Sequence, residues 1–158
     1  MRLFLDTNVL VSAILFPKSS VAQFLERAIE HHTIVISSFV IEELYGVFDE
    51  KFSDHTRDLE AFLSELSYEL IHYPRYVDRS HYPYVRDDDD LPIIASAIIG
   101  DCDYLITGDK DILEVGIERP VVLSPGEFQR MELENVEETE LRVGLETEPI
   151  QTEQTGNQ

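Results

Sequence analysis

The chain has 158 residues and a mass of 18.2 kDa, which is typical of one compact domain. Hydrophobic residues make up 43% of it, which excludes a wholly disordered chain, and no apolar run approaches the roughly 20 residues that span a bilayer. The single cysteine, Cys102, excludes a disulfide framework and a cysteine zinc site. The apolar start lacks a small-residue cleavage site, so we expect a cytoplasmic protein that makes no membrane contact.

The net charge is strongly negative. Thirty-two Asp and Glu stand against 12 Lys and Arg, giving a formal charge of −20 and a pI near 4.3. Such a charge repels nucleic acid and other polyanions unless cations intervene. Three lysines among this many acids lead to the hypothesis of a high-salt habitat, with an ordinary acidic protein as the alternative.

The first half of the chain alternates short strands with helices. A strand over 3–5 precedes a helix over 8–16 and an amphipathic helix over 19–30. A β-branched strand over 33–37 leads into a helix that ends near Phe52. An amphipathic helix over 54–66 and a strand over 69–73 follow.

The second half continues this pattern. A helix over 90–99 precedes a strand over 104–107 and a short helix over 109–114. The last strand covers 121–123, and the last helix runs from Pro125 to about Leu133. Short strands separated by helices predict an α/β fold, in which helices cover both faces of a parallel sheet.

The acids of the C-terminal stretch differ from those of the body. Residues 131–158 hold eight acids and one base, and the polar end from Glu146 has no aromatic residue. We therefore expect a folded domain over 1–130 and an acidic, largely disordered tail over 131–158.

Two of the predicted strands are followed closely by aspartates. Asp6 comes directly after the first strand, and Asp109 comes two residues after the strand over 104–107, with Asp111 in the same loop or first helical turn. Ligands of parallel sheets bind beyond the carboxyl ends of the strands. Each aspartate could instead cap the helix that follows it.

Two further acids lie next to apolar helix faces. Asp90 shares a helical stripe with Ile93, Ile94 and Ala97, whereas Asp89 is an alternative one residue earlier. On the helix over 38–52, Glu43 flanks the side that is expected to be buried, and Glu42 is its alternative. Both could also be ordinary surface acids. A cluster of carboxylates without Cys or paired His suits Mg²⁺ or Mn²⁺.

Four segments around these acids resemble the four acidic motifs of PIN domains. They are LDTNVLVSA at Asp6, SSFVIEEL at Glu43, DDLPIIASAI at Asp90 and DYLITGDKDIL at Asp109. The order and spacing match over roughly residues 1–130. The likeness is greatest to the VapC-type toxins of toxin–antitoxin pairs.

The resemblance implies a Rossmann-like three-layer α/β/α sandwich and an endoribonuclease that cleaves RNA with Mg²⁺ or Mn²⁺. It implies that the four motif acids are catalytic and hold the metal together with Asp111. It gives Thr7, Asn8 and Thr107 supporting roles beside them. It also allows a cognate antitoxin protein and a homodimer as partners.

One loop offers residues for binding RNA. The stretch 72–86 contains Arg75, Arg79 and Arg86 among four tyrosines, a pattern that can pair with phosphates and stack on unpaired bases. The same residues could merely pack a long loop over the sheet edge.

The sequence also agrees with two other functions. The chain could be a non-catalytic PIN-type module that an antitoxin binds or that associates with itself. It could also be a phosphoryl-transfer enzyme or receiver domain, which use an aspartate at a strand end. Phosphatases of that kind usually carry a second aspartate two residues later, where this chain has Asn8.

Overall fold

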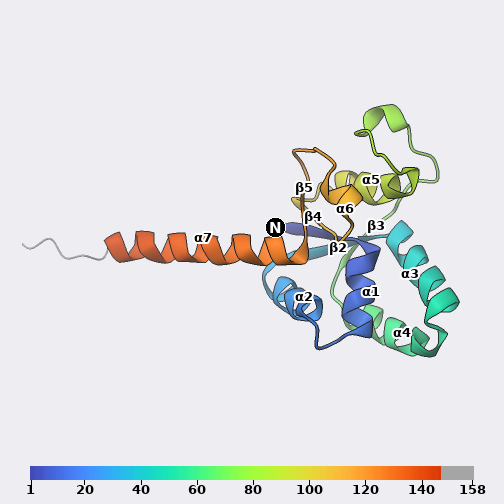
Figure 1. Ribbon diagram of the computed structural model, residues 1–158, viewed down its shortest axis with the longest axis horizontal. Coiled ribbons are helices and arrows are strands. Elements are labelled where there is room, and N and C mark those ends of the chain that lie inside the picture. Colours follow the sequence, from blue (N-terminus) through green and yellow to red (C-terminus); the bar gives the residue numbers. More distant parts are fainter. Residues whose placement is uncertain (147–158) are drawn as a thin grey trace, which may run out of the picture.

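The structure is a computed structural model that describes residues 1–146. Its centre is a five-stranded sheet in the order β3-β2-β1-β4-β5, and every neighbouring pair is parallel. The strands are β1 (Arg2–Leu5), β2 (Thr33–Ser37), β3 (Glu69–Ile71), β4 (Tyr104–Ile106) and β5 (Val121–Leu123). The expected α/β sandwich is confirmed, because helices cover both sides of the sheet (Figure 1).

Within residues 1–146, seven α-helices connect the strands or cover the sheet. They are α1 (Thr7–Leu15), α2 (Ser20–His31), α3 (Ser38–Lys51), α4 (Thr56–Glu65), α5 (Leu91–Ile99), α6 (Lys110–Leu113) and α7 (Pro125–Glu146). In Figure 1, α1, α2 and α4 lie below the strands, and α5 lies above them. Within residues 1–146 no single helix has the length and apolarity to cross a bilayer, and α1 and α2 meet that test only as a pair bent by 110°.

The two central strands are apolar because they are covered on both faces. In β1, Leu3, Phe4 and Leu5 are completely buried, and Val35 and Ile36 of β2 are buried beside them. Continuous apolar runs of this kind are typical of parallel strands with helices on both sides. The sheet therefore provides a rigid base for the residues at its carboxyl edge.

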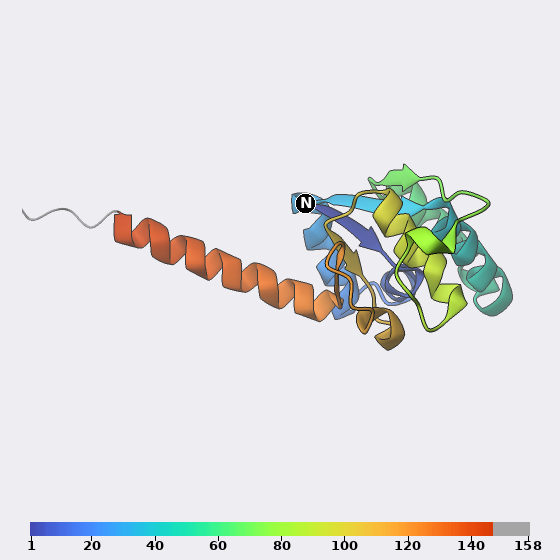
Figure 2. The ribbon, with the colours of Figure 1, turned by 90° about the horizontal axis from the view of Figure 1, so that it is seen from above.

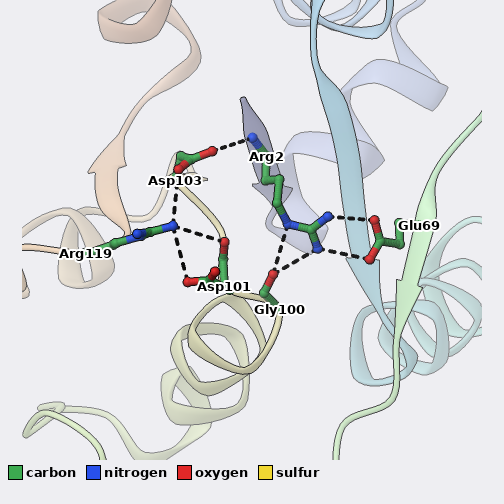
Figure 3. Close-up of polar contacts among 6 residues, drawn as sticks. All are labelled: Arg2, Glu69, Gly100, Asp101, Asp103 and Arg119. Atoms are coloured by element: carbon green, nitrogen blue, oxygen red, sulfur yellow. Dashed lines mark hydrogen bonds and ion pairs between the residues drawn. The ribbon is translucent and has the colours of Figure 1, made fainter.

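A polar network ties the opposite edge of the sheet together (Figure 3). The guanidinium of Arg2 in β1 donates to both carboxylate oxygens of Glu69 in β3, at 2.6 and 3.0 Å, and to the carbonyl of Gly100 after α5, at 3.1 and 2.9 Å. The backbone N–H of Arg2 donates to Asp103, which also pairs with Arg119. The pKa of the Arg2 guanidinium is raised by its bond to Glu69. Three sheet segments that are distant in sequence thus share one arginine.

The last helix is longer than the sequence predicts. We expected it to end near Leu133, but α7 continues to Glu146 and extends away from the body (Figures 1 and 2). The expected disordered tail is therefore wrong for residues 131–146, and the remaining part, 147–158, lies outside the described residues. The physical reason is that glutamate and leucine are strong helix formers, whether or not the helix packs on a core.

The start of α7 is fixed by one aromatic side chain. Phe128 is completely buried, and its ring packs edge-on against Phe24, His32 and Tyr104 with centroid distances of 5.8, 5.4 and 5.2 Å. His32 also contacts the carboxylate of Glu132, one turn further along α7. From Leu133 on, α7 is exposed.

Candidate active site

The predicted acids meet at the carboxyl edge of the sheet, between β1 and β4. The chain crosses from one half of the sheet to the other between these strands, which makes their carboxyl ends the usual ligand position of an open α/β sheet. The backbone N–H of Asp6 continues the β1–β4 ladder by donating to the carbonyl of Ile106 at 3.0 Å. Asp6 and the loop after β4 are therefore held side by side.

Asp6 is both a helix cap and a buried acid. Its Oδ1 accepts a 2.7 Å bond from the N–H of Thr7 at the start of α1, so the capping interpretation is correct. Its Oδ2 accepts a 2.7 Å bond from the hydroxyl of Thr107, and only 5% of the residue is exposed. Burial raises the pKa of Asp6 to about 6, and the charges of Glu43 and Asp109 raise it further against the lowering effect of both hydrogen bonds.

The loop after β4 is organised around Thr107. The Thr107 hydroxyl accepts a bond from the N–H of Asp109 at 3.0 Å while it donates to Asp6. Asp109 in turn accepts from the N–H of Asp111, and Asn8 accepts from the N–H of Gly108 at 3.3 Å. Thr107 thus contacts both Asp6 and Asp109, and Asn8 holds the loop between Thr107 and Asp109.

Glu43 and Asp90 come from the two helices that face this edge. Glu43 lies on α3 and is half-buried, whereas Glu42 is exposed, so the burial pattern agrees with the choice of Glu43. Asp90 directly precedes α5 and makes no side-chain capping bond to it. Partial burial raises the pKa of Asp90 to about 6, with a further contribution from Asp109 and from the neighbouring aspartates.

One cavity of about 480 Å³ connects these side chains. Asp6, Glu43, Asp90 and Asp109 all line it, together with Asp89, so the choice between Asp89 and Asp90 stays open. Thr7 and Asn8 lie on the same wall, beside an apolar surface from Val11, Val47, Phe52, Ile93 and Ile112. Four acids from four separate segments therefore share one space.

The donor set of this cavity is suited to a hard divalent cation. Carboxylate and hydroxyl oxygens are the ligands that Mg²⁺ and Mn²⁺ prefer. The buried hydroxyl of Thr7 has no hydrogen-bond partner in the described residues and lies in the cavity wall. Nevertheless, no three acidic, His or Cys side chains of residues 1–146 are close enough to ligate one ion. Mg²⁺ usually takes one or two carboxylates and keeps several waters, so the residues fit an ion of this type.

The comparisons with known proteins agree with this geometry. The family model described as PIN domain matches residues 2–111, which include every acid of the cavity. The chain belongs to the PIN domain family. No curated protein matches it.

A solved structure supports the same assignment for the fold. The PIN domain is similar to a chain in the crystal structure of VapBC2 from Rickettsia felis bound to a DNA fragment from their promoter. The identity is 26% and the TM-score is 0.59, over 78% of this chain and 98% of that chain. About a fifth of the present chain thus has no counterpart there.

Some predicted residues of the PIN domain do not line the cavity. Asp111 is exposed and contributes only its backbone bond to Asp109 and its charge near Asp90. Arg75, Arg79 and Arg86 are exposed outside the cavity, and Arg79 pairs with Asp88 at 2.9 Å.

Sequence reasoning missed two polar residues of the cavity. Lys51 lies at the end of α3 and is the only cationic side chain on the cavity wall within the described part of the chain. Ser12 of α1 lies on the same wall. Helical spacing could have found both, because Ser12 is four residues after Asn8, and Lys51 follows Glu43 and Val47 at steps of four.

Proposed function

We propose that the PIN domain is an endoribonuclease that hydrolyses RNA phosphodiester bonds with Mg²⁺ or Mn²⁺. The observation that carries the proposal is the single cavity lined by Asp6, Glu43, Asp90 and Asp109. Like charges in one space are unfavourable without a counter-charge. Burial raises the pKa of Asp6, and the charges of Glu43 and Asp109 add to this effect. The family membership supports the same activity.

In this proposal some side chains bind the cation and others orient the carboxylate of Asp6. One or two of the four acids would ligate the cation directly, and the others would face its water ligands. When bound, the cation would supply an activated water molecule and offset negative charge on the scissile phosphate. Thr107 and the N–H of Thr7 fix both oxygens of Asp6, so this carboxylate keeps one orientation. The Thr7 hydroxyl has hydrogen-bonding capacity to spare for a water molecule or the substrate.

Binding of RNA to so acidic a protein needs local cations. Lys51 on the cavity wall supplies one positive charge beside the acids, where a phosphate would meet it. Arg75, Arg79 and Arg86 would contact the flanking RNA from the exposed loop before α5. Asp111 would add negative charge at the rim of the cation site.

A cleavage assay tests this proposal. Purified protein is incubated with a mixture of RNAs, with EDTA or with Mn²⁺, and the amount of cleaved RNA is measured on a denaturing gel. We expect cleavage only with the metal, and a loss of about 100-fold or more for Asp6→Asn. Glu42→Gln is the matched control, because this exposed glutamate lies outside the cavity. Equal cleavage by the protein and Asp6→Asn would refute the assignment.

A second candidate function is that of a PIN-type domain that binds a protein and does not catalyse a reaction. The similarity to a chain of a VapBC2 complex favours a PIN-type module that a cognate antitoxin binds or that forms a homodimer. Inactivity of the parent protein on all RNAs with either cation, together with a stable complex with a protein partner, would support this candidate instead.

A further inference from the structure

A second groove lies at the opposite edge of the sheet from the acids. It has a volume of about 570 Å³ and runs between α2, the first residue of the chain and α7. Its apolar lining consists of Met1, Phe24, Leu133 and Val136. Its charged lining is divided between the two helices, with Arg27 and His31 on α2 and Glu132 and Glu140 on α7. Figures 1 and 2 show α7 leaving the body beside the N-terminus, so the groove opens along the projecting helix.

Three of the four apolar side chains of this groove are exposed to solvent. Met1 is 51% exposed, Leu133 is 60% exposed and Val136 is 53% exposed. Contiguous exposed apolar groups, here next to the part of α7 that packs on the body, are typical of surfaces that bind another protein. The rigid attachment of α7 through Phe128 holds Leu133 and Val136 in position above α2.

The charge around the groove limits what can occupy it. Between Met131 and Glu146, α7 carries six glutamates and one arginine. A second copy of α7 laid along the first would bring two such acidic helices together, in a protein of net charge −20. The chain's own residues 147–158 add two more acids and only one large apolar side chain, Ile150. Neither is complementary to the groove.

We propose that the groove between α2 and α7 binds a basic amphipathic helix of another protein. The apolar face of that helix would cover Met1, Leu133 and Val136, and its Lys and Arg side chains would face the glutamates of α7. Glu140 is exposed and lines the groove, so it supplies part of the complementary charge. The surface is separate from the acidic cavity, so binding there does not depend on RNA cleavage.

Binding of a model peptide tests the proposal on the full-length protein. The probe is a labelled helical peptide of roughly 18 residues, with leucines on one face and lysines on the other, titrated at physiological salt. A scrambled peptide of identical composition controls for attraction by charge alone. We expect the amphipathic peptide to bind at least about tenfold more tightly than the scrambled one.

Two sets of variants locate the binding surface. Leu133→Ser with Val136→Ser should remove this preference for the amphipathic peptide, whereas Leu141→Ser should keep it, because Leu141 is an equally exposed apolar residue of α7 outside the groove. Equal affinity of both peptides, or equal binding by all variants, would overturn the proposal. Sedimentation of the protein alone gives a further test, since a dimer that the double substitution dissociates would identify a second copy as the occupant.

Discussion

Asp6 is the most buried acid of the cavity and has a raised pKa, and this couples stability to pH. Its pKa is about 6 in the folded protein and 3.8 for the ordinary group, so the folded state holds a proton that the unfolded state has released. Between these values the free energy of unfolding falls as the pH rises. Above pH 6 the cost is complete, and two pKa units correspond to about 3 kcal/mol.

A divalent cation should offset this cost only where Asp6 is ionised. We expect Mg²⁺ to raise the melting temperature more at pH 7 than at pH 5, compared with Na⁺ at equal ionic strength. The measurement is a thermal melt at each pH with EDTA, Na⁺ or Mg²⁺. Asp6→Asn has no carboxylate to ionise at this position and should reduce the difference between the two pH values, to which Asp90 also contributes. An equal effect of Mg²⁺ at both pH values would contradict the role of Asp6.

The sequence could identify the acids of the cavity but not their supporting contacts. Strand ends indicated Asp6 and Asp109, and apolar helix stripes indicated Asp90 and Glu43, because burial follows periodicity. The unpaired hydroxyl of Thr7 and the two bonds of Thr107 depend on side-chain orientation, which periodicity does not specify. Lys51 was missed because no acid motif includes it.

Among the elements, β1, β3 and the end of α5 are joined by Arg2 at the edge of the sheet opposite the acids. Arg2→Ala removes the bonds to the buried Gly100 carbonyl together with those to Glu69, at a cost of about 1–2 kcal/mol for the carbonyl bonds. Glu69→Ala removes only the partner at the solvent-exposed end. We therefore expect a larger loss of stability for Arg2→Ala in urea unfolding.

A control substitution for Arg2→Ala and Glu69→Ala lies outside the hydrogen bonds of Arg2. Arg57→Ala removes an exposed arginine of α4 and should leave the unfolding midpoint nearly unchanged. If Glu69→Ala is as destabilising as Arg2→Ala, the ion pair with Glu69, and not the bonds to Gly100, holds the edge.

At the scale of elements, sequence patterns located every strand, and β5 matches its expected range. The strand expected over 69–73 ends earlier, at Ile71, since β2 offers pairing partners only up to Ser37. The length of α7 was underestimated because an acidic composition is shared by solvated helices and disordered tails. Its projection beyond Phe128 depends on three-dimensional packing at one end, which composition does not reveal.

The whole molecule carries a charge that opposes its proposed substrate. At −20, the protein repels RNA over distances comparable with the Debye length, about 10 Å at 0.1 M salt. We expect kcat/KM for a short RNA to rise several-fold as NaCl increases from low to moderate concentration at saturating Mg²⁺. Basic nucleases show the opposite trend, because salt weakens their phosphate contacts.

The same self-repulsion acts on stability. Melting temperatures that increase up to molar salt would agree with the hypothesis of a high-salt habitat, whereas a maximum at low salt would refute it. A fall of kcat/KM with NaCl would show that the local cations, Lys51 and the loop arginines, dominate the approach of RNA over the net charge.

The sheet order has a consequence for the synthesis of the protein. β1 leaves the ribosome first, but its partner β4 and the acid that follows, Asp109, emerge about a hundred residues later. A nascent chain that ends before Asp109 lacks one wall of the cavity, whatever its earlier segments have formed. The ribosome and its message are therefore exposed to a complete set of acids only after Asp109 has been synthesised.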